Sequence, residues 1–151
     1  MSLKKDLNRK VILLAEDNPA DQHLTRRALE DVNCPHELVV VRDGEDALEY
    51  LTRSGKYADS SQCPYPDLVL LDINMPKING KEVLKNMRAD NRTRHIPVLV
   101  LTTSNQENDV QEAYRLGANA YITKPDRYDG FIEIAKAIKS FWLRMVSLPP
   151  R

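Results

Sequence analysis

Short runs of apolar residues alternate along the chain with longer stretches in which apolar residues recur at helical spacing. The runs predict five strands, because β-branched and other apolar residues concentrate in them. Three of the runs are apolar without alternation, which is typical of parallel strands buried on both faces. In chain order the predicted strands cover residues 11–15, 38–41, 68–71, 98–101 and 120–123.

Each predicted strand is followed by a stretch with the spacing of an amphipathic helix. The first helix begins at Pro19 with Asn18 as its N-cap, and it continues to about Asp31. Gly117 is a stop signal for the fourth helix, and segment 54–66, which contains Gly and Pro, is predicted to be a loop. The last helix is long. The apolar positions that define the second to fifth helices are Ala47, Leu48 and Leu51; Val83, Leu84 and Met87; Val110, Ala113, Tyr114 and Leu116; and Phe131, Ile134, Ala135, Ile138, Phe141, Trp142 and Met145.

The order is therefore β-α repeated five times, which predicts an α/β fold with a five-stranded parallel sheet and five helices. Right-handed crossovers place helices on both faces, so the open sheet is doubly wound. We expect one domain over residues 10–146, with an N-terminal extension, 1–9, before it and a short C-terminal tail, 147–151, after it. No output domain is expected.

Composition narrows the class of protein. With 42% hydrophobic and 29% charged residues among 151, the chain has the make-up of one soluble globular domain. A formal net charge of zero argues against nucleic-acid binding, and no apolar run approaches the ~20 residues of a membrane span. Cys34 and Cys63 lack metal-site spacing and are interpreted as free thiols, so we expect a cytoplasmic protein.

A local cluster of basic residues is formed by Arg88, Arg92, Arg94 and His95. We interpret it as a solvated helix end and loop rather than a binding patch, because the chain as a whole has no basic surplus. The histidines of the chain are scattered and show no metal-site spacing.

Polar side chains follow four of the five predicted strands, at the edge where ligands bind in open parallel α/β sheets. Glu16 and Asp17 follow the first strand, and Asp72 follows the third. The fourth strand is followed by the hydroxyl residues 102–104, and the fifth by Lys124. Together these residues predict a site with carboxylates for a hard cation, a nucleophile and a fixed positive charge.

The three carboxylates of this edge predict either that one carboxyl group takes up a proton or that a cation is bound between them. Two unit charges 4 Å apart repel each other by roughly 4 kcal/mol at an effective dielectric of about 20. A cation removes this repulsion, and a site with few carboxylates that meets a phosphate suits Mg²⁺, with Mn²⁺ as a substitute. Mg²⁺ and Lys124 would then stabilise the charge on a phosphoryl group during its transfer.

The residues of this edge resemble those of the receiver domain of two-component response regulators. The resemblance spans about residues 10–145 and is carried by Glu16-Asp17, LLDINMP at 70–76, Thr102, and YITKP at 121–125. It implies the flavodoxin-like receiver fold and a signalling protein rather than an enzyme. A sensor histidine kinase would donate a phosphoryl group to Asp72, which would switch a protein-interaction face in phosphorelay signal transduction.

The resemblance also implies a role for each residue at the phosphorylation site. Asp72 would be the phospho-acceptor, and together with Asp17 it would ligate Mg²⁺. Glu16 would hold a metal-bound water, and Asn74 would give its backbone carbonyl to the metal. Lys124 would contact the phosphoryl group, and the following Pro125 resembles the cis-proline of the family.

Further roles implied by the resemblance concern switching and the lifetime of the phosphoryl group. Thr102 would contact the phosphoryl group, and Tyr121 would move into the space that Thr102 leaves. This shift would remodel the face of the fourth helix, fifth strand and fifth helix. A threonine at 103, where many receivers have Ala or Gly, would restrict small phosphodonors. The positions that tune hydrolysis in this family are Asn74, Thr103 and Ser104.

Shorter phrases resemble single-domain regulators that are paired with bacterial phytochromes. They are EDNPAD at 16–21, VRDG at 41–44, LTTS at 101–104 and FWL at 141–143. The kinase would then be a bacterial phytochrome, whereas the downstream protein is not indicated. Some members of this group dimerise through the switching face and the last helix. Phe141, Trp142 and Met145 would then lie in a homodimer interface; the alternative is that they cap the core of a monomer.

Three other functions compete with this interpretation. A hydrolase of the haloacid dehalogenase type needs an Asp two residues after its nucleophile, where this chain has Asn74. A flavodoxin needs a Ser/Thr/Gly-rich phosphate loop after the first strand, where this chain has EDNP at 16–19. A phosphorylation-independent interaction module is the remaining alternative, although all of the acceptor residues are present.

Overall fold

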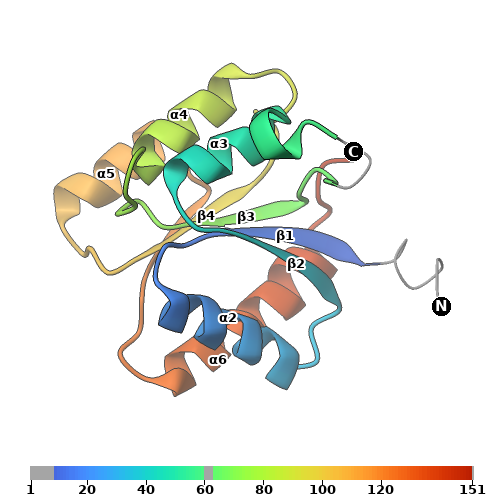
Figure 1. Ribbon diagram of the computed structural model, residues 1–151. Coiled ribbons are helices and arrows are strands. Elements are labelled where there is room, and N and C mark those ends of the chain that lie inside the picture. The colour runs from blue at the N-terminus through green and yellow to red at the C-terminus, as the bar shows by residue number, and fades with distance from the viewer. Residues whose placement is uncertain (1–8, 60–62, 151) are drawn as a thin grey trace.

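A five-stranded parallel sheet forms the centre of the computed structural model, which describes residues 9–59 and 63–150 (Figure 1). The strand order is β2-β1-β3-β4-β5, with one crossover between each pair of consecutive strands. The predicted α/β class, number of strands and doubly wound arrangement are therefore confirmed. The strands are β1 (Lys10–Ala15), β2 (His36–Val41), β3 (Leu68–Leu71), β4 (Val98–Thr102) and β5 (Ala120–Thr123).

Helices cover both faces of the sheet: α2 and α6 lie against one face, and α3, α4 and α5 lie against the other (Figure 1). A short 3-10 helix, η1 (Gly55–Tyr57), lies within the predicted loop 54–66, of which residues 60–62 are outside the described part. In the part of the chain that the structure describes, no helix is long and apolar enough to cross a membrane. The helices are α2 (Pro19–Asp31), α3 (Gly44–Thr52), α4 (Gly80–Ala89), α5 (Glu107–Arg115) and α6 (Tyr128–Ala137).

The alternation of side chains along the strands divides the core into two parts. Leu13 and Ala15 of β1 pack in the cluster beneath α3, α4 and α5. Ile12 and Leu14 point to the opposite face, into the cluster with α2 and α6. Complete burial of one such aliphatic side chain stabilises a fold by roughly 1.5–3 kcal/mol. Burial on both faces thus holds β1, β3 and β4, and with them the residues that follow these strands, in fixed positions.

The last helix is extended, as predicted. Helix α6 continues into η3 (Ile138–Met145), which has π-helical hydrogen bonding. Trp142 is half-buried and packs against the cluster beneath α2 and α6. Phe141 and Met145 are instead 48% and 73% exposed, so they form an apolar surface near the end of the chain.

In the basic cluster, Arg92, Arg94 and His95 are exposed, as predicted, whereas Arg88, in the last turn of α4, departs from the prediction of a solvated side chain. It is half-buried, and its guanidinium group uses all five of its N–H donors. These hydrogen bonds tie α4 to the segments that precede β4 and β5. The acceptors are the carbonyl oxygens of Arg94, Ile96 and Gly117, the last of which accepts two bonds, and Oδ1 of Asn119.

Candidate functional site

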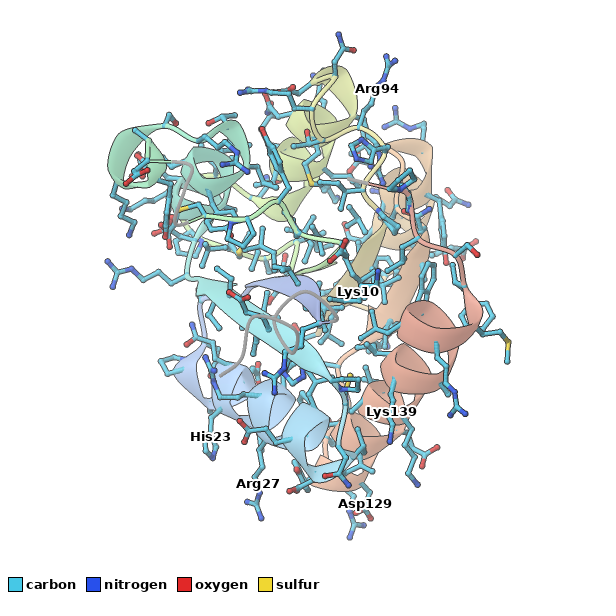
Figure 2. The ribbon with its side chains drawn as sticks, turned by 90° about the vertical axis from the view of Figure 1, so that its right-hand side faces the viewer. Lys10, His23, Arg27, Arg94, Asp129 and Lys139 are labelled. Atoms are coloured by element: carbon cyan, nitrogen blue, oxygen red, sulfur yellow. The ribbon has the colours of Figure 1, made fainter. Side chains whose placement is uncertain are left out.

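The parallel register brings the residues after the strands to one edge of the sheet, on the left of Figure 1 where β1 leads into α2. Ala15 lies opposite Leu71, and the N–H of Asp72 donates to the carbonyl of Ala15 at 3.0 Å. On the far side of β4, the N–H of Lys124 donates to the carbonyl of Thr102 at 2.7 Å. Figure 2 shows the molecule from the opposite edge, where Lys10 begins β1.

Three carboxylates surround the ammonium group of Lys124. Its Nζ lies 2.7 Å from Oε1 of Glu16, 2.8 Å from Oδ2 of Asp72 and 2.9 Å from Oδ2 of Asp21. Burial by itself would lower the pKa of Lys124, but the hydrogen bonds to Asp72, Glu16 and Asp21 raise it above its ordinary value. The ammonium group therefore stays charged although its side chain is only 6% exposed.

Asp21, the third carboxylate that contacts Lys124, was not among the site residues predicted from the strand ends. It lies in the first turn of α2, where Oδ1 of Asn18 accepts hydrogen bonds from the N–H groups of Ala20 at 2.8 Å and Asp21 at 3.2 Å. A carboxylate in a first turn is ordinarily explained by the helix dipole. Its partner, Lys124, is 103 positions away, so the sequence carries no local signal for the contact.

A second feature of the site is a cluster of carboxylates. Oxygen atoms of Glu16, Asp17 and Asp72 lie within 4.8 Å of one another. Glu16 is buried, and burial raises its pKa to about 7 even though it accepts a hydrogen bond from Lys124. Asp17 is exposed. Three hard oxygen ligands with one neighbouring cation fit a divalent ion such as Mg²⁺, which would offset their repulsion.

The predicted acceptor and the residues beside it are brought together. Oδ1 of Asp72 accepts a hydrogen bond from the N–H of Asn74 at 2.9 Å. The side-chain amide of Asn74 donates to Oγ1 of Thr102 at 3.3 Å, which links the ends of β3 and β4. Thr102 is fully buried, whereas Thr103 is exposed.

The predicted switch residue Tyr121 is held by Ser104. The Tyr121 hydroxyl donates to the carbonyl of Ser104 at 2.9 Å, and its ring packs against the cluster beneath α3, α4 and α5. The Ser104 hydroxyl in turn donates to Oδ2 of Asp109 at 2.5 Å, and Lys81 of α4 lies 2.7 Å from the other oxygen of Asp109. Ser104 thus connects Tyr121 to an ion pair between α4 and α5, a link that the sequence did not indicate.

The predicted cis bond before Pro125 is wrong. Within residues 9–59 and 63–150 the structure contains no cis peptide bond. The trans form is favoured by roughly 0.5–1 kcal/mol even before proline, and Lys124 reaches its three carboxylates from it. Gly130 of α6 approaches Pro125 so closely that a Cβ atom at 130 would clash with the proline ring. This packing holds the turn after Lys124.

Two features together define a receiver domain. The strand order is β2-β1-β3-β4-β5, and the site has carboxylates after β1 and β3, a hydroxyl at the end of β4 and a lysine after β5. Residues 12–136 match the family model described as the response regulator receiver domain, so the chain belongs to this family. Its members are the response regulators of two-component signalling.

The chain is similar along almost its whole length to phytochrome-associated regulators. It is 43% identical over 140 residues to "Response regulator Rcp1" of Synechocystis sp., with 93% of each chain covered. It shares 44% identity and a TM-score of 0.87 with the phosphorylated cyanobacterial phytochrome response regulator RcpA, covering 94% of this chain and 99% of that one. With the Mn²⁺-bound form of Rcp1 it shares 42% identity and a TM-score of 0.85, covering 93% of this chain and 99% of that one.

Proposed function

We propose that this protein is a single-domain response regulator that accepts a phosphoryl group on Asp72 from a sensor histidine kinase in a Mg²⁺-dependent reaction. The observation that carries the proposal is the environment of Asp72. Its side chain is 5% exposed, one oxygen contacts Lys124, and the other accepts the N–H of Asn74. Glu16 and Asp17 lie beside it. The outcome is a signal, and the protein is not an enzyme with a substrate of its own.

Asp72 supplies the nucleophile. One carboxylate oxygen forms a bond to phosphorus while the phosphorus–nitrogen bond of a kinase phosphohistidine breaks, and the electron pair stays on the imidazole nitrogen. Lys124 at 2.8 Å and the N–H of Asn74 at 2.9 Å orient the carboxylate before the reaction. The charged Lys124 then donates to a phosphoryl oxygen, which stabilises the negative charge there in the transition state.

A divalent cation completes the site. When bound, Mg²⁺ shields the negative charges of the carboxylates and of the phosphoryl group. Asp17 and Asp72 would ligate it directly, as would the backbone carbonyl of Asn74. Glu16 would act through a water, because its two oxygens are already engaged by Lys124 and by the N–H of Asn18 at 3.1 Å. Mn²⁺ is the expected substitute, which the Mn²⁺-bound form of Rcp1 supports.

Phosphorylation would change the hydrogen bonds of Thr102 and Tyr121. The Thr102 hydroxyl, which now accepts from Asn74, would turn to the phosphoryl group. Tyr121 would leave the carbonyl of Ser104 and move into the vacated space. The face of α5, β5 and α6 would then be remodelled for a downstream protein. Asn74, Thr103 and Ser104 would set the lifetime of the phosphorylated state.

The partners follow from the same comparison. The likeness to RcpA, a cyanobacterial phytochrome response regulator, supports a bacterial phytochrome as the kinase. The cytoplasm remains the proposed location, on the composition of the chain. The receiver domain would span residues 10–146. Exposed Phe141 and Met145 support a homodimer through the face of α5, β5 and α6, with Trp142 beside them.

Phosphotransfer from an autophosphorylated, radiolabelled bacterial phytochrome kinase tests this function. The label should move to the wild-type chain within minutes when Mg²⁺ is present, and it should not move to Asp72→Asn. Asp129→Asn is the matched control, because it removes the same charge from an exposed position on α6 (Figure 2). Transfer to Asp72→Asn at the native rate would refute the assignment of the acceptor.

A further inference from the structure

Asp21 contacts Lys124 as closely as the site residues do, yet the acceptor chemistry described above gives it no task. We infer that Asp21 is a positioning residue that holds Lys124 in the resting protein and slows the entry of an anionic phosphodonor. This inference rests on the proposed function, because it concerns the rate at which Asp72 takes up a phosphoryl group. It predicts that the negative charge of Asp21 is not needed for phosphoryl transfer and slows the reaction of the resting protein.

The first argument is a count of hydrogen bonds. An ammonium group has three N–H donors. Three carboxylates lie within 2.7–2.9 Å of Nζ of Lys124, so every donor is in use. Lys124 can therefore contact a phosphoryl oxygen only if one of the carboxylates gives up its hydrogen bond.

The second argument identifies the carboxylate that gives way. The side chain of Glu16 is 2% exposed and that of Asp72 is 5% exposed, whereas that of Asp21 is 22% exposed. A buried carboxylate without a partner is costly, but a carboxylate at the surface can exchange its partner for water. Asp72 is also the group that reacts. Asp21 is therefore the carboxylate that must release Lys124 before the phosphoryl group can replace it.

The third argument is the charge itself. Asp21 adds a negative charge beside Glu16, Asp17 and Asp72, at the point where an incoming phosphoryl group meets Lys124. One charge acting on a dianion across ~6 Å of water changes an equilibrium by about tenfold, and salt reduces this to about threefold. Removing the charge of Asp21 should therefore favour both the approach of the donor and the release of Lys124.

The test compares four chains: wild type, Asp21→Asn, Asp21→Glu and Glu30→Gln. Glu30→Gln removes the same charge from an exposed position on the same helix, about nine residues or ~14 Å farther along it. Phosphorylation in Mg²⁺ is followed by intact mass over a range of acetyl phosphate concentrations. In this reaction the Asp72 oxygen bonds to phosphorus, the phosphorus–oxygen bond of the donor breaks, and acetate leaves with the electron pair.

We expect Asp21→Asn to take up the phosphoryl group about threefold to tenfold faster, mainly through a lower half-saturating donor concentration. The gain should shrink in high salt, and Asp21→Glu and Glu30→Gln should not show it. Damage to the fold would slow the reaction, so a merely structural role cannot produce this gain. If wild type is phosphorylated and Asp21→Asn reacts at the same rate or more slowly, the inference is overturned and the proposed function stands. If neither chain is phosphorylated by acetyl phosphate or by a kinase, the proposed function fails and the inference fails with it.

Discussion

Replacing Arg88 by Met should destabilise the fold by about 2–4 kcal/mol, because buried acceptors would lose their donors. Met keeps the apolar stem but removes five hydrogen bonds. Arg94 and Asn119 are exposed, so their oxygens can turn to water, whereas Ile96 is buried and Gly117 is half-buried. Each buried acceptor left without a donor costs roughly 1–3 kcal/mol. Two such acceptors, one of them only half-buried, give the expected range.

Urea denaturation followed by circular dichroism and by the fluorescence of Trp142, the one tryptophan of the chain, measures this loss. Arg115→Met is the matched control, because the Arg115 side chain is 70% exposed and pairs only at the surface with Glu112, at 3.2 Å. Such a surface pair contributes at most about 1 kcal/mol. Equal losses in the two variants would refute the claim that the buried hydrogen bonds of Arg88 hold α4 to β4 and β5.

Three further outcomes are expected. Because burial raises the pKa of Glu16 from 4.5 to about 7, the folded protein binds more protons than the unfolded chain between these values. The free energy of unfolding of the metal-free protein should therefore fall by up to about 3 kcal/mol as the pH rises from 4.5 to 7. Glu16→Gln should flatten this pH dependence, and the same dependence in Glu16→Gln as in wild type would contradict the raised pKa of Glu16. Mg²⁺ at ~100 times its dissociation constant should raise the free energy of unfolding by about 2.7 kcal/mol. Asp17→Asn should lose most of that increase, and an equal increase in both proteins would exclude Asp17 as a ligand. Burial raises the pKa of the Cys34 thiol to about 11, so iodoacetamide should label Cys34 at pH 8 far more slowly in the folded than in the urea-unfolded protein, as measured by peptide mass spectrometry; equal rates would contradict its burial.

The inner strands β1, β3 and β4 could be predicted because burial on both faces makes their sequences almost uniformly apolar, whereas the edge strands β2 and β5 are only partly buried. The extra residue of β4, Thr102, is polar and joins the strand only because it pairs with Thr123. The π-helical end of the last helix could not be predicted, since the apolar spacing of 138–145 fits either kind of helix. The short helix η1 depends on a distant contact, in which the Tyr57 hydroxyl donates to Asp46 at 2.8 Å.

The part of the site that follows directly from the ends of the strands could also be predicted. Glu16, Asp17, Asp72 and Lys124 directly follow strands of one parallel sheet, and the carboxyl ends of such strands meet at one edge. Asp21 could not be found in this way, because its contact with Lys124 depends on how α2 packs beside the sheet.

The two remaining surprises have the same physical origin. Arg88 looked solvated in the sequence, but its long side chain reaches carbonyl groups up to 29 positions away. The hydroxyl of Tyr121 likewise meets the backbone of Ser104 across 17 positions. Side chains that reach across elements leave no periodic pattern, so only the packed structure reveals their partners.

The central claim is that Asp72 accepts a phosphoryl group, and intact mass after incubation with phosphoramidate tests it most directly. The wild-type chain should gain the mass of one phosphoryl group only when Mg²⁺ is present, and the added mass should be lost in base, as expected for an acyl phosphate. Asp72→Asn should gain nothing, whereas Asp129→Asn should behave like wild type. A gain on Asp72→Asn, or a gain that does not depend on the metal, would contradict the account.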